Sequence, residues 1–422
     1  MPPTCAPIFT YRLAGSFGPS GAQRRLTSRV SLRASSQKVG WTFIWYKRLW
    51  LTLRLVAFQR SKLFDLAVES APVDWAPPGE LVKSYQASDG TYEIWKGSLA
   101  DPAVKQLVNR IQVLVPLFIE GGTFIGTHVS DGLARWTVFF LYRKTNAPGP
   151  GITPYEFAGY STVYRFFYFK KPTERRLLTA ADFKLPFESF TVVEEPARTR
   201  ISQFIILPPF QHKGNAGQLY STIFQHYLDS PEVVEITVED PNEAFDDLRD
   251  LTDRSYLLGI PEFHSIKIDT SVVFEPGRAS KNPVDEAAVE ELRLKTKIAP
   301  RQFHRLVEMQ LMSRLPVSVR PRIEDEPRVA ATDAEKHEYR LWKGLVKQRL
   351  YRRNKEILGQ LDREERIQKL DETLGAVEME YARLLAAAAD RAKHGEQTAK
   401  PKRGLEANSS EPTSKKARLD TQ

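Results

Sequence analysis

Apolar residues recur at helical spacing between residues 99 and 118, which predicts an amphipathic helix. The apolar positions are Val104, Leu107, Val108, Ile111, Leu114 and Val115. Asp101-Pro102 supplies a start for this helix, because Asp favours the capping position and proline fits the first turn. We expect the helix to lead to Glu120.

Segments rich in β-branched and aromatic residues predict strands. These segments are residues 92–96, 136–142, 157–169, 201–207 and 233–238. Glycines and prolines at 146–151 form a turn cluster that suits an antiparallel pair. Residues 75–80 form a turn-rich entry, and the long polar stretch 171–199 predicts a surface loop.

The strand at 201–207 leads into a glycine-bearing loop, residues 211–217, and then into a helical segment, residues 218–228. The strand at 233–238 follows, and residues 241–252 predict a second helix. Strand, glycine loop, helix and strand together form a compact α/β unit.

Beyond Pro283 the pattern is helical, and residues 341–385 are charged and periodic. Leu370, Leu374, Val377, Tyr381 and Leu384 follow a 4-3-4-3 spacing that lines one face. That face suits either packing against the chain's own domain or a dimerising coiled coil. From Lys393 onward the chain is polar and of low complexity, which predicts disorder.

The composition limits which class of protein the chain can belong to and which kinds of site it can contain. The 422 residues are 41% hydrophobic, which fits two folded units with tails. Cys5 is the single cysteine, so a disulfide framework and a cysteine-built zinc site are both excluded. No two of the 7 histidines have the spacing of a helical metal pair, and we expect no metal.

The formal net charge of +9 is concentrated at the N-terminus. Residues 1–64 contain 11 Lys and Arg and no acid, and subtracting them leaves 50 bases against 52 acids. The body of the protein is therefore not a basic nucleic-acid surface. The head itself suits an irregular extension, a mispredicted first exon or a mitochondrial transit signal. Charged residues interrupt the apolar stretch 41–58, so we expect no membrane span.

The segment 201–217 carries the clearest chemistry. A hydrophobic strand ends in a loop whose small residues, Gly214, Ala216 and Gly217, leave backbone amides uncovered before a helix. Free amides and the partial positive charge of a helix N-terminus favour an anion such as pyrophosphate. The loop lacks the Gly-Lys-Ser/Thr ending of kinases and P-loop enzymes and the further glycines of a Rossmann dehydrogenase. The spacing alone also occurs in α/β proteins without a ligand.

Gln211-x-x-Gly214-x-Ala216 resembles the acetyl-CoA motif of the GNAT acetyltransferases. The larger match, residues 204–206, 208–210 and 235–245, is similar to the type B histone acetyltransferases. The resemblance covers residues 75–270 and, more loosely, the helical region to about 315. It does not include the segment before Leu55 or the loop 171–199. Asn215 replaces a more usual His or Leu, and Ala216 the second glycine.

The resemblance implies an α+β GNAT fold, a mixed and mostly antiparallel sheet flanked by helices, with a helical C-terminal region. Four regions follow: a basic irregular extension at 1–64, the acetyltransferase domain at 65–270 with its acetyl-CoA core at 200–252, a helical domain at 271–392, and a disordered basic tail at 393–422.

The resemblance also implies acetyl-CoA as cosubstrate. Backbone groups of Phe204, Ile205 and Ile206 would meet its acetyl and pantetheine portion, and Asn242 would approach its thiol end. The residues expected around the pyrophosphate are Gln211, His212, Lys213, Gly214, Asn215, Ala216 and Gly217.

Acetyl transfer to lysine needs a proton acceptor, because the side-chain ammonium has an ordinary pKa of about 10.4. Acids at family-matching positions are Glu239, Asp240 and Glu120, and we expect Glu239 to act first. The alternative for the adjacent pair Glu239 and Asp240 is a helix-capping role without catalysis.

Residues 229–253 contain ten acids and one base, Arg249, which would attract a lysine-rich tail. The resemblance implies histone H4, with H3 as its companion, as the substrate, and a WD40-propeller histone chaperone as partner. Basic clusters at 400–403 and 414–418 are of nuclear-localisation type and suit a protein of nucleus and cytoplasm. A non-catalytic chromatin scaffold with a degenerate acetyltransferase fold is the alternative.

Overall fold

The computed structural model describes residues 75–127, 132–145, 153–167, 196–273, 281–323 and 329–399. The expectations for the N-terminal extension, the turn cluster at 146–151, nearly all of the loop at 171–199 and the two basic clusters of the tail lie outside these residues. Within the described ranges, no helix combines the length and the apolar character that a bilayer crossing requires.

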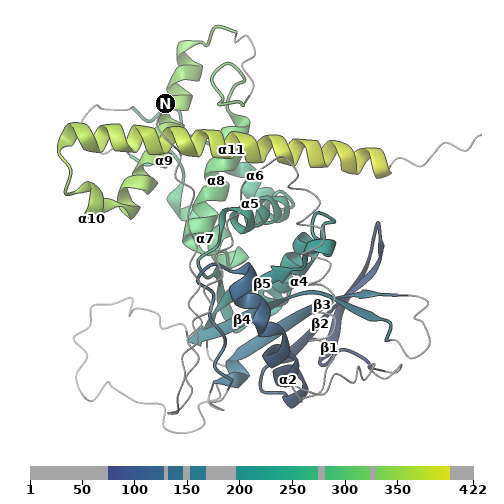
Figure 1. The fold of residues 1–422 in the computed structure, drawn as a ribbon. Helices are drawn as coiled ribbons and strands as arrows, with labels where there is room; N and C mark the ends of the chain where they lie inside the picture. Colours follow the sequence, from purple (N-terminus) through teal and green to yellow (C-terminus); the bar gives the residue numbers. More distant parts are fainter. Residues whose placement is uncertain are drawn as a thin grey trace, which may run out of the picture. The chain divides into compact units, whose positions relative to one another are not determined.

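Six strands form one sheet in the order β1-β2-β3-β4-β5-β6 (Figure 1). The strands are β1 (Glu80–Ala87), β2 (Gly90–Ser98), β3 (Trp136–Lys144), β4 (Tyr155–Phe167), β5 (Ala197–Ile206) and β6 (Val233–Val238). Neighbours from β1 to β5 pair antiparallel, and β5 and β6 pair parallel. The predicted α+β fold with a mixed, mostly antiparallel sheet is confirmed.

The sequence prediction missed β1 and began β5 too late. Leu81 and Val82 of β1 are exposed, so this edge strand lacks the alternation that marks a half-buried strand. Residues 197–199, which were assigned to a surface loop, already pair with β4. Their sequence, Ala-Arg-Thr, carries little apolar signal, and the pairing comes from the neighbouring strands.

Helices cover the sheet and bury its centre (Figure 1). Every residue of β3 from Val138 to Tyr142 is buried, as expected for a strand covered on both faces. Helix α4 (Asn215–Asp229) packs on this strand through Tyr227, whose ring lies 6.2 Å from that of Phe139. Helix α2 (Pro102–Ile111) approaches β2 at Gly97, where a Cβ atom would lie 2.5 Å from Val104 Cγ2.

The helix predicted for residues 99–118 begins as expected but is interrupted. Asp101 caps α2 by accepting hydrogen bonds from the amides of Ala103 at 2.7 Å and Val104 at 3.2 Å. After Ile111 the chain forms the short 3-10 turn η1 (Gln112–Leu114) and then the short helix α3 (Val115–Phe118). Pro116 explains the interruption, since proline cannot donate to the carbonyl of Gln112 and its ring clashes there.

Helix α5 (Glu243–Leu257) starts two residues later than predicted and ends five residues later. The C-terminal helices follow it in sequence. They are α6 (Pro261–Ser265), α7 (Glu286–Thr296), α8 (Pro300–Arg314), α9 (Asp333–Arg353), α10 (Lys355–Leu358) and α11 (Arg363–Ala399). Two further 3-10 turns, η2 (Leu133–Arg135) and η4 (Pro208–Phe210), precede β3 and α4.

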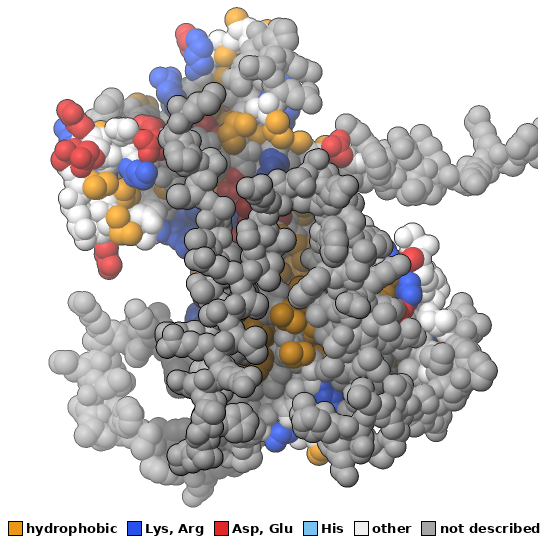
Figure 2. All heavy atoms as spheres, viewed as in Figure 1, with side chains coloured by type: hydrophobic (Ala, Val, Ile, Leu, Met, Phe, Trp, Pro, Cys, Tyr) orange, Lys and Arg blue, Asp and Glu red, His pale blue; other side chains and the backbone are white. Residues whose placement is uncertain are grey.

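The periodic face of α11 packs against the chain's own helices. Leu374, Val377, Tyr381 and Leu384 are buried, and α11 contacts α5, α8 and α9. Of the two interpretations of this face, packing within the domain is therefore the one the structure supports. Where α10 joins α9 and α11, charged side chains of both signs are interspersed at the surface (Figure 2).

Candidate active site

Strands β5 and β6 separate at the end of the sheet, and this fork organises the site. Their last pair is Ile201 with Val238, and the amide of Glu239 donates to the carbonyl of Ile201 at 2.9 Å. Beyond that point β5 continues beside β4 as far as Ile206. Ser202 is an extra residue in the β4–β5 register, which is a β-bulge, and bulges bend the strand that carries them.

The open edge of β5 presents the backbone of two of the three strand residues expected to meet acetyl-CoA. The amide of Gln203 donates to Thr162 Oγ1 at 3.2 Å and that of Leu207 to the Ala158 carbonyl at 2.9 Å, so both point toward β4. Because backbone groups alternate along a strand, Phe204 and Ile206 face the other way, toward the fork. Ile205 faces β4 and does not present its backbone there.

The loop before α4 has the backbone shape of an anion cradle. The backbones of His212 and Gly214 are left-handed, with φ values of 60° and 83°. Left-handed residues that alternate with other residues along a loop turn successive amides toward the same concave side. Gln211, His212, Lys213 and Gly214 are exposed, and Gly214 is the N-cap of α4. A Cβ atom at Gly214 would meet nothing within 4 Å, so the space before the helix is open.

Three side chains of this loop are committed to holding it. Gln211 Nε2 donates to the Ile206 carbonyl at 2.7 Å, and Lys213 Nζ lies 2.6 Å from Asp89 Oδ2 in the turn between β1 and β2. Asn215 is buried: it accepts from the Tyr85 hydroxyl at 2.7 Å and donates to the Phe210 carbonyl at 2.9 Å. Its side chain thus anchors the loop, and only its amide could serve a ligand.

The first turn of α4 places Ala216 and Gly217 next to the cradle, both partly buried. Neither has a bulky side chain, and a Cβ atom at Gly217 would meet only Leu248 Cδ1 at 4.0 Å. The backbone amides of this turn belong to the free donors at a helix N-terminus. Small side chains leave them accessible to a phosphate group.

Glu239 and Asp240 lie at the fork itself. The Glu239 side chain is 45% exposed; Ser202 Oγ donates to its Oε2 at 2.5 Å, and Arg200 Nη1 lies 3.8 Å from Oε1. Asp240 is exposed and has a φ of 33°. Non-glycine residues rarely adopt this strained backbone conformation, and such conformations cluster at functional sites. The sequence prediction missed Ser202 and Arg200, because the bulge that sets Ser202 has no signature in the residue pattern.

The loop that carries Glu120 is held against the same strand. Glu120 is exposed and follows α3, and its loop is fastened to β5 where Gln203 Nε2 donates to the Thr123 carbonyl at 3.0 Å. Gln203 is the neighbour of Ser202, so the loop carrying Glu120 and the fork carrying Glu239 share one stretch of β5. The segments that carry the three predicted acids are thus each hydrogen-bonded to β5.

The helix after the fork is capped by Asn242 and not by the two acids before it. Asn242 Oδ1 accepts from the amide of Phe245 at 2.9 Å, and the residue is exposed. The capping alternative for Glu239 and Asp240 therefore loses its support. Asn242 has a structural role of its own, and its approach to the cofactor thiol stays a prediction.

The acidic run at 229–253 is not one surface. Seven of its ten acids lie within ion-pair distance of arginines. The pairs are Glu232 with Arg165, Glu235 with Arg198, Glu239 with Arg200, Glu243 and Asp247 with Arg383, Asp250 with Arg305 and Asp253 with Arg249. Glu239, Asp240 and Glu243 nevertheless remain exposed around the fork. These three acids are therefore the ones of the run that could attract a basic substrate there.

Among the residues that the structure describes, no group of three or more His, Cys, Asp or Glu side chains is arranged to hold a metal ion. The expected absence of a metal stays a prediction. The chemistry the fork offers is a set of exposed carboxylates beside an open strand edge and an anion cradle. This combination suits a substrate with a phosphate group and a second substrate with a positive charge.

Two protein-family models match the chain. The model described as the N-terminus of the histone acetyl transferase HAT1 matches residues 47–120, and that described as the C-terminal part of fungal HAT1 matches residues 270–315. The first match begins before Leu55, so the family likeness reaches further toward the N-terminus than the sequence analysis found.

Curated relatives align with most of the chain. A histone acetyltransferase type B catalytic subunit of Gibberella zeae is 48% identical over 377 residues, which cover 86% of this chain and 79% of that protein. A protein of the same description from Pyricularia oryzae is 47% identical over 368 residues, covering 86% and 79%. One from Neurospora crassa is 48% identical over 362 residues, covering 80% and 71%.

Proposed function

Because this chain belongs to the family of histone acetyltransferase type B catalytic subunits, we propose that it acetylates lysines in the N-terminal tail of free, newly synthesised histone H4 during chromatin assembly. Acetyl-CoA is the cosubstrate that the family implies. The observation that carries the proposal is the fork of β5 and β6, where an open strand edge, an anion cradle and exposed carboxylates meet.

The residues of the fork and its loop fit acetyl-CoA. The backbone of Phe204 and the amide of Ile206 can pair with the pantetheine arm, as an added strand would. The backbone amides of the exposed residues His212 to Gly214 and the N-terminus of α4 suit the pyrophosphate. Acetyl-CoA supplies the thioester carbonyl that a lysine amine attacks.

Glu239 is the group best placed to accept the proton of the attacking amine. The hydrogen bond from Ser202 and the nearby Arg200 hold its carboxylate at the fork, where it can accept a proton. Proton loss creates the free amine, the nitrogen then attacks, and the coenzyme thiolate leaves. Asp240 and Glu120 would orient the ammonium and pass the proton to water.

Histone H3 as the companion of H4, and a WD40-propeller histone chaperone as partner subunit, belong to the same proposal, as do locations in both nucleus and cytoplasm. Exposed acids at the fork favour a lysine-rich tail over an acidic or neutral peptide. A non-catalytic scaffold would not need these acids to stay exposed.

The test is mass spectrometry of an H4 tail peptide incubated with the purified chain and acetyl-CoA. Acetylated lysines supported by catalytic amounts of the chain are expected, and an H3 tail peptide is the comparison. Absence of turnover with retained acetyl-CoA binding would favour the scaffold. Turnover on H3 but not on H4 would overturn the substrate assignment alone.

Cofactor binding is tested separately with Gly214→Glu. The added carboxylate would stand in the open space before α4 and repel pyrophosphate, and a side chain at φ 83° is strained. We expect acetyl-CoA affinity, measured by calorimetry, to fall by about 100-fold or more, a loss of at least about 2.7 kcal/mol. Gly375→Glu, at an open position in α11, is the matched control. Equal affinity in both variants would contradict the cradle.

A further inference from the structure

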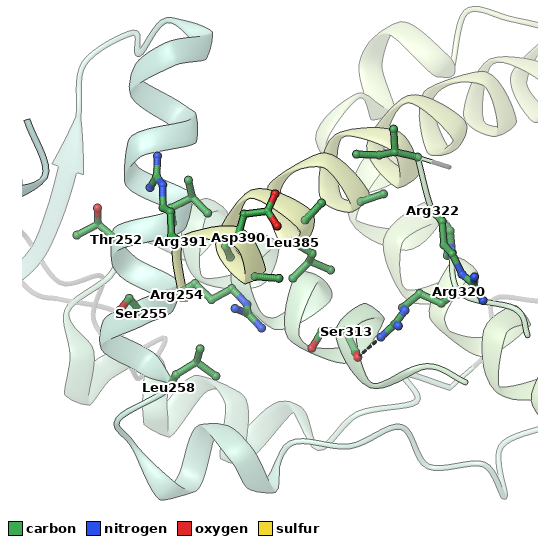
Figure 3. Close-up of a pocket in the computed structure, with 17 residues that line it drawn as sticks. Thr252, Arg254, Ser255, Leu258, Ser313, Arg320, Arg322, Leu385, Asp390 and Arg391 are labelled. Atoms are coloured by element: carbon green, nitrogen blue, oxygen red, sulfur yellow. Dashed lines mark hydrogen bonds between the residues drawn. The ribbon is translucent and has the colours of Figure 1, made fainter. Parts of the chain in front are cut away.

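A groove lies between α5 and α11 (Figure 3), and none of the residues that line it belongs to the fork. It has a volume of about 1150 Å³. Its walls come from the C-terminal half of α5, from Ser313 at the end of α8, from residues 320–323, and from residues 382–391 of α11. Small side chains on α11, among them Ala386 and Ala389, leave the space open.

The charges lining this groove are mostly positive. Four arginines and one aspartate line it, which gives 4 − 1 = +3. The residues are Arg254, Arg320, Arg322, Arg391 and Asp390. Arg254 and Arg320 lie on either side of Ser313 (Figure 3). Arg320 Nη1 donates to the carbonyl of Ser313 at 2.8 Å, which orients its guanidinium at the groove.

Arg254 is the least compensated of these cations. It is partly buried; its Nη2 donates to Gln310 Oε1 at 3.2 Å, and its Nε is buried without a hydrogen-bond partner. Burial lowers its pKa, and no described carboxylate lies within ion-pair distance to offset that. Removing a charge from water without a partner costs free energy. No carboxylate of the described residues offsets this free-energy cost, whereas a bound anion would.

The floor of the groove is apolar. Leu251 of α5, Leu258 at the C-cap of that helix and Leu385 of α11 line the groove, and the lining residue Ile323 is 52% exposed. An inorganic anion would satisfy the arginines but would leave this floor and most of the volume uncovered. A ligand that fits both features carries carboxylates and apolar side chains together.

We propose that this groove binds an acidic amphipathic peptide segment of a partner protein. Carboxylates of the segment meet Arg254 and Arg320, and its apolar side chains cover the leucines of the floor. A histone tail is excluded as occupant by its positive charge. The chain's own residues 393–422 contain seven bases and four acids, so they too are repelled.

A fluorescent peptide tests the proposal on the full-length chain. The probe is a peptide of about 14 residues, roughly four helical turns, with Leu on one face and Glu elsewhere. We expect saturable binding that weakens with salt, and at least about 10-fold weaker binding to the double variant Arg254→Gln, Arg320→Gln. The matched control, Arg363→Gln with Lys369→Gln, removes two charges from exposed positions on α11 and should bind as the unaltered chain does.

Three outcomes would overturn the proposal. They are absence of saturable binding, equal binding to the double variant, and equal binding of a probe in which Lys replaces Glu. A fourth would assign the groove to this chain itself: binding that appears only after Glu324, Asp325 and Glu326 are replaced by Gln.

A measurement of stability distinguishes a binding role of Arg254 from a structural role. Because Arg254 is partly buried and has no acidic partner among the described residues, Arg254→Gln should leave the urea midpoint unchanged or raise it, while peptide binding weakens. A lower midpoint together with unchanged peptide affinity would make Arg254 a structural residue and contradict the proposal.

Discussion

Two sets of carboxylates in this molecule have opposite environments. Among the predicted catalytic acids, Asp240 and Glu120 are exposed, and the Glu239 side chain is 45% exposed. Between α5, α8 and α11, the side chains of Asp250, Asp253 and Glu308 are at most 2% exposed. Each set includes two acids of the run at 229–253, yet only the first set is free to exchange protons with a substrate.

The buried acids are satisfied by partners from several helices. Arg349 of α9 donates to both oxygens of Glu308, at 2.7 and 2.8 Å, and the Tyr381 hydroxyl of α11 donates to it at 2.8 Å. Gln302 bridges Asp250 at 2.8 Å and Asp253 at 3.2 Å. These bonds fix how the C-terminal helices pack.

The difference teaches that pairing separates a structural acid from a functional one. A buried acid whose two oxygens both accept hydrogen bonds cannot accept a proton from a substrate without losing one of those bonds. An exposed acid such as Glu239, with a hydroxyl donor on one oxygen and an arginine 3.8 Å from the other, can. Substitutions in the two sets should therefore change different quantities: turnover at the fork, and the free energy of unfolding between the helices.

The largest expected effect is on turnover in Glu239→Gln. The amide keeps the size of the side chain but cannot accept a proton, so turnover should fall by roughly 10² to 10⁴, while acetyl-CoA affinity and stability barely change. Steady-state kinetics on the H4 tail peptide, with calorimetry for the cofactor, measure these quantities. Glu243→Gln, a nearby exposed acid in the first turn of α5, is the control.

The double variant with Asp240→Asn measures how far the two acids share the task. If both acids pass the proton through water, the fold-loss of turnover in the double variant should be much smaller than the product of the fold-losses in the two single variants. Unchanged turnover and pH dependence in Glu239→Gln would direct the search for the base to Glu120 or Asp240.

The buried set gives the next largest effect. Arg349→Met removes both guanidinium bonds and leaves Glu308 buried with an uncompensated charge, which should lower the free energy of unfolding by about 3–5 kcal/mol. Urea denaturation measures it. Adding Glu308→Gln should restore much of the loss, because the stranded charge is then removed. Failure of this rescue would show that Arg349 acts through packing alone.

Asp253 should make stability depend on pH. Burial raises its pKa to about 6, so the fold favours its protonated form. The free energy of unfolding should therefore fall as pH rises from about 4 to about 6, by up to about 3 kcal/mol for a shift of roughly two units. In Asp253→Asn this fall should be absent. Parallel pH dependence in the two proteins, measured by urea denaturation, would contradict the assignment.

The elements that periodicity determines could be predicted from the sequence. Residues 99–111 and the buried face of α11 carry local patterns, and the loop at 211–217 carries a motif with its own backbone requirements. Strand β1 and the break before Pro116 were missed. The first was missed because an edge strand has weak alternation, and the second because the six apolar positions keep their helical spacing as far as Val115.

The division of the acids could not be predicted, because their partners are distant in sequence. Arg305 is 55 residues from Asp250, and Arg349 is 41 residues from Glu308. Nothing in the run at 229–253 separates acids that receive such arginines from acids that stay exposed. Tertiary packing alone decides this.

The smallest effect concerns Ser202, whose hydroxyl lies 2.5 Å from Glu239 Oε2 at the β-bulge. In Ser202→Ala the carboxylate loses its one hydroxyl donor, and a hydrogen bond to a charged group is worth about 1.5–3 kcal/mol. We expect a few-fold loss of kcat with little change in the KM for acetyl-CoA, because the carboxylate that accepts the proton is then less firmly held. Ser202→Thr keeps a hydroxyl at the same position and should retain the original kcat. A purely structural role of the bulge would instead lower kcat equally in the alanine and threonine variants. If both variants keep the kcat of the serine protein, the hydroxyl contributes nothing to proton transfer.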